Sequence, residues 1–208
     1  MSVEAIRFAS ADGTGLEGEV AVAADAWAAA VLCHPHPQYG GSMRAGLIGD
    51  LFRTLPEQGV TTLRFNFRWV EGSDGAWDEG RAERADAAAA VDTLAAAVPA
   101  SLPLLLAGWS FGGDMALSTH HPRVAGWCVI APPLHSAHAL DVIGADPRPK
   151  HVILGERDDV VSADRVADVT STWRATTLEV IPGASHFFVG RSAEVDVAVF
   201  KFCAAICR

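Results

Sequence analysis

The run Gly108-Trp109-Ser110-Phe111-Gly112 separates two segments of different character, and it decides the fold of the chain. Residues 103–108 (PLLLAG) are almost continuously apolar, which is typical of a strand buried on both faces. Residues 111–120 begin a helix. Glycines two positions before and after the serine let a strand and a helix approach without Cβ clashes. The pattern predicts a tight strand-to-helix turn with an exposed Ser110 hydroxyl, although a glycine-rich turn with an incidental serine has the same letters.

The same alternation of strands and helices extends along the chain. Residues 3–8 and 16–22 alternate apolar and polar around Ala-Asp-Gly-Thr-Gly, which predicts an antiparallel hairpin. Further strands are expected at 27–33, 60–67, 103–108, 124–130, 151–154 and 177–181, and helices at 45–55, 81–98, 111–120 and 192–206. This order predicts an α/β fold: a mostly parallel sheet with an N-terminal antiparallel hairpin and helices on both faces. A length of 208 residues, half of them hydrophobic, predicts one domain spanning 1–208.

Ligands of such sheets bind where loops leave the carboxyl ends of the strands. These loops are 34–43, 67–80, 109–112, 131–148, 155–161 and 182–190.

Charge and composition exclude several classes of protein. The net charge is −9 and no basic patch is visible, so a nucleic-acid partner is not expected. An apolar run long enough to span a membrane is lacking, and the first ten residues do not resemble a signal peptide. We therefore predict a cytoplasmic protein without membrane or nucleic-acid partners, and we leave a homodimer open.

The four cysteines are consistent with a reducing compartment. Cys33 and Cys128 lie in apolar runs and are expected to be buried thiols. Cys203 and Cys207 are four apart on an expected helix, where a disulfide has poor geometry.

A serine hydroxyl needs a base within hydrogen-bond reach to become a nucleophile. When the serine lies on a tight strand-to-helix turn of this kind, an acidic residue and then a histidine follow it along the chain, each after a late strand. The strand at 151–154 is followed by Gly155-Glu156-Arg157-Asp158-Asp159, and the Gly-x-x-Asp spacing favours Asp158 as the acid over Asp159. Asp158 would orient the imidazole and stabilise the imidazolium.

His186 is the expected base because it follows the last strand, in Pro182-Gly183-Ala184-Ser185-His186. The other histidines do not lie after that strand: His34, His36, His120, His121, His135, His138 and His151. The order Ser110, Asp158, His186 matches that of α/β-hydrolase triads. We therefore predict the α/β-hydrolase fold with these three catalytic residues.

The loop His34-Pro35-His36-Pro37 follows the first buried strand, where this fold supplies a second oxyanion-hole donor. Because proline has no N–H, His36 is the donor among residues 35–37. We assign the backbone N–H groups of Phe111 and His36 to the oxyanion hole, with Tyr39 in reserve. His-x-His can also bind zinc, but a third ligand at recognisable spacing is missing, so no metal is expected.

These motifs carry a family resemblance. The chain resembles small bacterial α/β-hydrolase-fold serine hydrolases with an HPHP oxyanion loop and a GxSFG nucleophile elbow. The matching stretches are HPHPQYGG at 34–41, RFNFR at 64–68, GWSFG at 108–112, GERD at 155–158 and GASHFF at 183–188. The resemblance spans about residues 31–190 and implies an esterase or acylhydrolase that needs no cofactor. One departure is Trp69, which stands where the wider superfamily often has glycine after the arginine.

The segment 131–150 is too short for a lid domain, so at most a loop or one short helix is expected there. This predicts an open, shallow site with little enclosing apolar surface, which argues against a lipase with interfacial activation. Aromatic side chains near the motifs could line a substrate pocket: Tyr39, Trp109 and Trp69, with Phe111 and Trp77.

The motifs together predict hydrolysis of carboxylic esters or thioesters of small or exposed substrates through an acyl-enzyme. A peptidase, an acyltransferase or a perhydrolase could use the same triad, and a non-catalytic binding protein could retain the fold. A panel of short esters, thioesters and aminoacyl amides would separate the first three. A wide separation of Ser110 Oγ from His186 Nε2 would favour the last.

Overall fold

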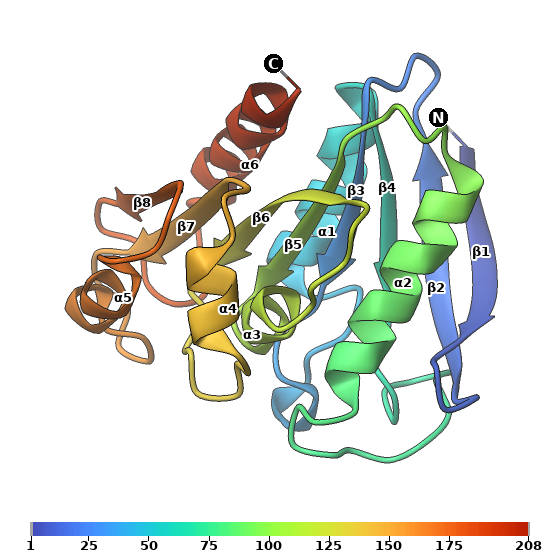
Figure 1. The fold of residues 1–208 in the computed structure, drawn as a ribbon, viewed down its shortest axis with the longest axis horizontal. Coiled ribbons are helices and arrows are strands. Elements are labelled where there is room, and N and C mark those ends of the chain that lie inside the picture. The colour runs from blue at the N-terminus through green and yellow to red at the C-terminus, as the bar shows by residue number, and fades with distance from the viewer. Residues whose placement is uncertain (1, 208) are drawn as a thin grey trace.

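Residues 2–207 are described by the computed structural model, and within this range eight strands form one sheet (Figure 1). Their order is β1-β2-β4-β3-β5-β6-β7-β8. The strands are β1 (Ser2–Ala9), β2 (Gly15–Val22), β3 (Ala28–Cys33), β4 (Val60–Phe65), β5 (Leu104–Trp109), β6 (Val124–Ile130), β7 (Lys150–Gly155) and β8 (Thr176–Ile181). β2 pairs antiparallel with β1 and β4, and the remaining neighbours are parallel. The predicted α/β-hydrolase fold class is confirmed.

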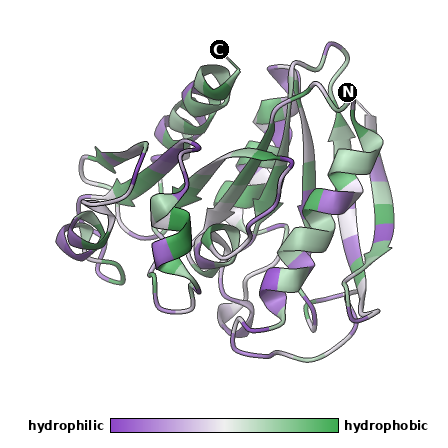
Figure 2. Ribbon diagram, in the orientation of Figure 1, coloured by the Kyte–Doolittle hydropathy of each residue, from purple (hydrophilic) through white to green (hydrophobic). Residues whose placement is uncertain are grey.

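The central strands separate two apolar cores. Every residue of β3 and β5 is buried, and alternate side chains of each strand enter opposite cores. One core is closed by α2 (Glu83–Ala97), α3 (Phe111–Leu117), α4 (Leu140–Ala145) and α5 (Ala163–Thr170). The other lies under α1 (Gly46–Glu57) and α6 (Ser192–Ile206). Figure 2 shows the central strands mostly in green, the colour of hydrophobic residues, whereas the helices around them also carry purple, hydrophilic residues.

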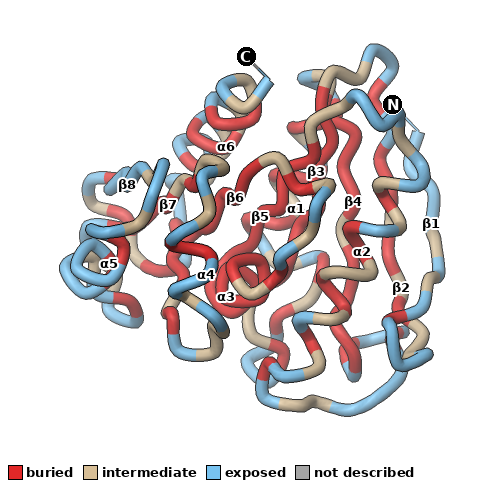
Figure 3. Tube along the Cα trace, viewed as in Figure 1, coloured by how far each residue is buried: buried red, intermediate tan, exposed pale blue. Residues whose placement is uncertain are grey.

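The two edges of the sheet are less covered than its centre. In Figure 3 the central strands are red, whereas β1 and β8 are largely pale blue. Within β8 only Ile181 is buried. The motif loops gather at the carboxyl ends of the parallel strands, at the lower side of Figure 1.

Several boundaries differ from the sequence prediction for local reasons. β4 ends at Phe65 rather than residue 67, because the Phe67 N–H donates to the His34 ring in a loop and not to a neighbouring strand. α3 ends at Leu117 rather than residue 120, and the Ser118 hydroxyl donates back to the Asp114 carbonyl. α5 was not predicted. It is short, and Ser162 caps its N-terminus by accepting a hydrogen bond from the Arg165 N–H (3.4 Å).

The segment between β6 and β7 contains α4 and loops, which agrees with the expected absence of a lid domain there. In the part of the chain that the structure describes, no helix is long and apolar enough to cross a membrane.

Candidate active site

Ser110 lies at the turn between β5 and α3 with φ 55° and ψ −121°, a backbone conformation that residues other than glycine rarely adopt. Its N–H donates to the carbonyl of Ile130 on the neighbouring strand (2.8 Å). The flanking glycines are required by contact. A Cβ on Gly108 would lie 2.2 Å from the Gly112 carbonyl oxygen, and a Cβ on Gly112 would lie 2.2 Å from the Cys33 carbonyl oxygen. The strand and helix therefore meet at the distance that the motif predicts.

Ser110, His186 and Asp158 form a chain of hydrogen bonds. His186 Nε2 lies 3.1 Å from Ser110 Oγ, and His186 Nδ1 lies 2.9 Å from Asp158 Oδ2. A carboxylate accepts, so Nδ1 carries the proton and Nε2 accepts from the serine hydroxyl. This is the tautomer in which an imidazole can take the proton of a nucleophilic serine.

Asp158 is held as an ionised acceptor. Its side chain has no exposed surface. The Oδ1 atom accepts from the N–H groups of Val160 (2.9 Å) and Val161 (2.7 Å). Burial favours the neutral acid, but the hydrogen bonds from His186 and these two N–H groups outweigh it and lower the pKa of Asp158. The carboxylate is thus suited to stabilise a positive imidazolium.

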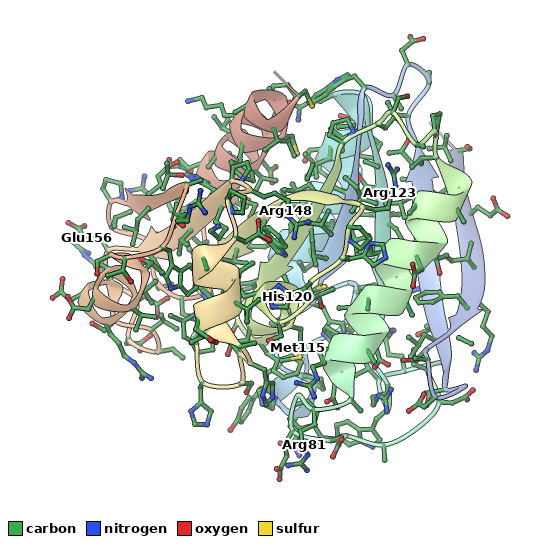
Figure 4. All side chains as sticks on the ribbon, viewed as in Figure 1. Arg81, Met115, His120, Arg123, Arg148 and Glu156 are labelled. Carbon is green, nitrogen blue, oxygen red and sulfur yellow. The ribbon has the colours of Figure 1, made fainter. Side chains whose placement is uncertain are left out.

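Three contacts fix the loop that carries His186. The indole N–H of Trp109 donates to the His186 carbonyl (3.2 Å). The Arg157 N–H donates to the Ala184 carbonyl (2.8 Å), next to Gly155, where a Cβ would lie 2.5 Å from the same oxygen. Glu156, at the left of Figure 4, accepts from the Gly183 N–H (2.7 Å). The acid and base loops are thereby joined through backbone groups.

The two residues predicted as oxyanion donors, Phe111 and His36, line the same cavity as Ser110. Phe111 begins α3, so its N–H has no partner within the helix. Among the hydrogen bonds of residues 2–207, none has the N–H of Phe111 or of His36 as its donor. The His36 and Phe111 rings lie 5.2 Å apart, which brings the HPHP loop against the start of α3. Within the described residues, both N–H groups are therefore without a protein acceptor.

His34 has a structural role that the sequence did not reveal. It is fully buried, its Nδ1 donates to the Pro35 carbonyl (2.6 Å), and its Nε2 accepts from the Phe67 N–H (3.1 Å). Burial lowers the pKa of His34 to about 4, so the ring is neutral. Nδ1 thus fixes the HPHP loop internally, and Nε2 holds it to the chain after β4.

The RFNFR motif completes this support. Asn66 Oδ1 accepts from the Met43 N–H (2.7 Å) at the end of the HPHP loop. Arg68 forms a buried ion pair with Asp86 on α2 (2.7 Å). The motif therefore ties the HPHP loop to β4, and β4 to α2.

A cavity of about 790 Å³ opens beside Ser110. Its walls come from the HPHP loop, the elbow, and the loops after β6, β7 and β8, and include Tyr39, Trp109, Pro133, His135, Val160 and Phe187. We predicted a shallow site with little enclosing apolar surface, and this was wrong. The loops themselves enclose a mainly apolar cavity without a lid.

Of the five aromatic residues predicted to line a pocket, Tyr39, Trp109 and Phe111 line this cavity, whereas Trp69 and Trp77 do not. Trp69 has φ 72° and a half-exposed side chain, and its N–H donates to the Asp74 carbonyl (2.8 Å). It takes a left-handed conformation that glycine adopts more readily, within a turn outside the cavity. Trp77 packs instead against the rings of His36 and Phe111.

Known proteins resemble this chain in sequence and in fold. The family described as an alpha/beta hydrolase domain matches residues 28–198. The chain belongs to the α/β-hydrolase family.

One relative of this hydrolase in sequence is uncharacterised, and two similar solved structures are described as serine hydrolases. An uncharacterised protein of Rickettsia prowazekii is 33% identical over 187 residues, covering 85% of this chain and 79% of that protein. An α/β serine hydrolase homologue from Coxiella burnetii is 28% identical with a TM-score of 0.86, covering 97% of each chain. A serine hydrolase without a lid from Xanthomonas campestris is 31% identical with a TM-score of 0.84, covering 95% and 92% of the two chains.

Sequence reasoning missed Asp114 of this hydrolase, which is fully buried four residues after Ser110. It accepts three backbone N–H groups from the loop after β6. The only signal in the sequence was an aspartate in the first turns of an otherwise apolar helix.

Proposed function

We propose that this α/β hydrolase cleaves carboxylic esters or thioesters, with Ser110 as nucleophile, His186 as general base and Asp158 as the orienting acid. The observation that carries the proposal is the continuous hydrogen-bonded chain from Ser110 Oγ through His186 to Asp158, beside a cavity large enough for a substrate. Its 3.1 Å Oγ–Nε2 distance argues against a non-catalytic binding protein.

The steps use groups of this chain, the substrate and water. Ser110 Oγ attacks the carbonyl carbon while its proton moves to His186 Nε2, and the carbonyl oxygen becomes an oxyanion held by the Phe111 and His36 N–H groups. The carbon–oxygen or carbon–sulfur bond to the leaving group then breaks, and His186 returns the proton to that group. Water, deprotonated by His186, hydrolyses the acyl-enzyme and regenerates Ser110.

The electrostatics of the cavity favour substrates without charge near the scissile bond. Among the described residues that line it, none carries a carboxylate, an ammonium or a guanidinium group. Burial lowers the pKa of His36, which keeps that ring neutral at pH 7. The net charge of −9 adds long-range repulsion of anionic substrates. A cytoplasmic location, the lack of membrane and nucleic-acid partners, and the oligomeric state stay predictions.

A fluorophosphonate probe and one serine substitution test the proposal. We expect the probe to label the wild type at Ser110, and Ser110→Ala to lower kcat by about 10⁶-fold, as for other serine hydrolases. Ser101→Ala is the matched control, because Ser101 is an exposed serine that does not line this cavity. A folded wild type that resists the probe and hydrolyses no member of an ester, thioester and aminoacyl amide panel would refute the proposal.

A further inference from the structure

The loop that takes the place of a lid is attached to the nucleophile helix by side chains of that helix. Asp114 Oδ1 accepts from the Leu134 N–H (2.8 Å), and Oδ2 accepts from the N–H groups of His135 (3.0 Å) and Ser136 (2.8 Å). One turn later, Ser118 Oγ accepts from the His138 N–H (2.8 Å). Four successive contacts thus connect α3 with residues 134–138, whose backbone has no strand or helix partner.

This loop would not hold its path by itself. Ala131, Leu134 and Ala139 have φ values of 45°, 56° and 55°, in the left-handed region that favours glycine. Non-glycine residues are strained in this conformation, so surrounding contacts must impose it. The fully buried carboxylate of Asp114 is placed to do so, because it satisfies three consecutive N–H groups at once.

The held segment is a wall of the cavity beside Ser110. Pro133, His135 and Ser136 line that cavity, and Asp114 accepts hydrogen bonds from the backbone N–H groups of the last two. The Gly80 backbone comes close to the same wall, because a Cβ at that position would lie 3.3 Å from the Ser136 Cβ and 3.0 Å from the Met115 Cε. Met115 is labelled on α3 in Figure 4, above Arg81.

We propose that Asp114 is a positioning residue that sets the ester selectivity of the site, by fixing the wall at 133–136 relative to the nucleophile on the same helix. The inference rests on the proposed function. Asp114 touches neither Ser110 Oγ nor His186, so it acts on the shape of the cavity and not on proton transfer. Its removal should therefore change which esters fit, while the chemistry of a small ester continues.

The test is Asp114→Asn. The amide keeps the shape of the side chain and one accepting oxygen, but an NH2 group that cannot accept replaces the other oxygen. p-Nitrophenyl acetate, butyrate and octanoate are compared, together with acetates of larger alcohols. In the acyl series, the alcohol series or both, we expect the ratio of kcat/KM between the largest and the smallest ester to change about 10-fold. The change should come from KM and not from kcat. The kcat for p-nitrophenyl acetate should stay within about threefold of the wild type.

Asp92→Asn is the matched control, an aspartate on α2 whose side chain is 71% exposed and pairs with His121. It should leave every ratio unchanged. Ser118→Ala removes one of the four contacts, so it should shift the same ratio in the same direction by less.

A purely structural role gives a different result. Loss of folded protein would lower kcat by one factor for every ester and leave each KM unchanged, and that result would overturn the inference. If Asp114→Asn does not fold, amide hydrogen exchange in the wild type decides: the N–H groups of 134–136 should exchange slowly, and exchange at the rate of an unstructured peptide would refute the inference. Failure of the proposed function is separate, since it appears as a wild type without probe labelling or ester hydrolysis.

Discussion

Two buried aspartates flank Ser110, and they differ in what they hold. Asp158 divides its oxygens between two backbone N–H groups and the His186 ring, whereas Asp114 gives both oxygens to three backbone N–H groups. The imidazole partner and the N–H groups outweigh burial and lower the pKa of Asp158, while burial outweighs the N–H groups and raises the pKa of Asp114 to about 6.

The difference shows how one residue type serves chemistry and shape. A carboxylate beside an imidazole stabilises the ring when it becomes positive, so its effect appears in the transition state. A carboxylate beside backbone N–H groups has no partner that gains charge during a reaction. Its effect lies in the conformation of the loop that it binds.

The largest expected effect breaks the catalytic half of the comparison. Asp158→Asn should lower kcat for p-nitrophenyl acetate by about 10⁴-fold, because the amide no longer selects the productive tautomer of His186. The neighbouring, exposed Asp159 gives the control, since Asp159→Asn should retain wild-type kcat. A drop of less than tenfold for Asp158→Asn would show that another group orients the imidazole.

A smaller effect separates the His36 backbone from its ring. His36 has φ −56°, which proline can adopt, so His36→Pro removes the N–H with little change of conformation. We expect kcat to fall by about 10²–10³-fold, the usual loss for one oxyanion donor. His36→Ala keeps the N–H and should lose far less. Equal losses in the two variants would assign the effect to the ring and not to the donor.

The smallest effect sharpens the contrast between the two carboxylates through pH. The pKa of Asp114 is higher folded than unfolded, so its contribution to stability is present below about pH 4 and is lost as pH rises through about 6. Asp114→Asn does not titrate. From pH 4 to 7, its unfolding free energy relative to the wild type should therefore rise, by up to about 3 kcal/mol.

Asp158 should behave in the opposite way. Because its pKa is lower in the folded state, the Asp158 carboxylate stabilises the fold at pH values above its unfolded pKa. This contribution is lost as pH falls through its folded pKa. Urea unfolding of wild type, Asp114→Asn and Asp158→Asn at pH 2, 3, 4, 5, 6 and 7 measures both slopes, because the Asp158 window lies below the unfolded pKa of about 4 and the Asp114 window lies above it. If the unfolding free energies of both variants, relative to the wild type, changed in the same direction with pH, the opposite pKa shifts of Asp114 and Asp158 would be contradicted.

Local patterns were sufficient to predict most of the fold. The sheet was predicted from the continuous apolar runs of β3 and β5 and from the alternation in β1 and β2. A strand that is buried on both faces needs apolar residues at nearly every position, so such a run indicates one. The prediction failed for α5, whose 163–170 segment is short and largely exposed, so its pattern is weak.

The site was predictable where a residue follows a strand in a known order. Ser110, Asp158 and His186 each occupy such a position, and the structure brings them into hydrogen-bond contact. Their catalytic roles stay predictions. Asp114 and the Trp109 indole could not be found, because their partners are backbone groups at least 20 residues away that the sequence does not mark.

The exposed edge of the sheet has a consequence for how this enzyme would lose activity. Asp158 and His186 follow β7 and β8, and β8 is buried only at Ile181, whereas Ser110 lies at the fully buried centre. Local unfolding begins where few apolar contacts protect the backbone. As denaturant rises, the acid and base should therefore separate from the serine while the central strands remain intact, and activity should disappear before the far-ultraviolet circular dichroism changes.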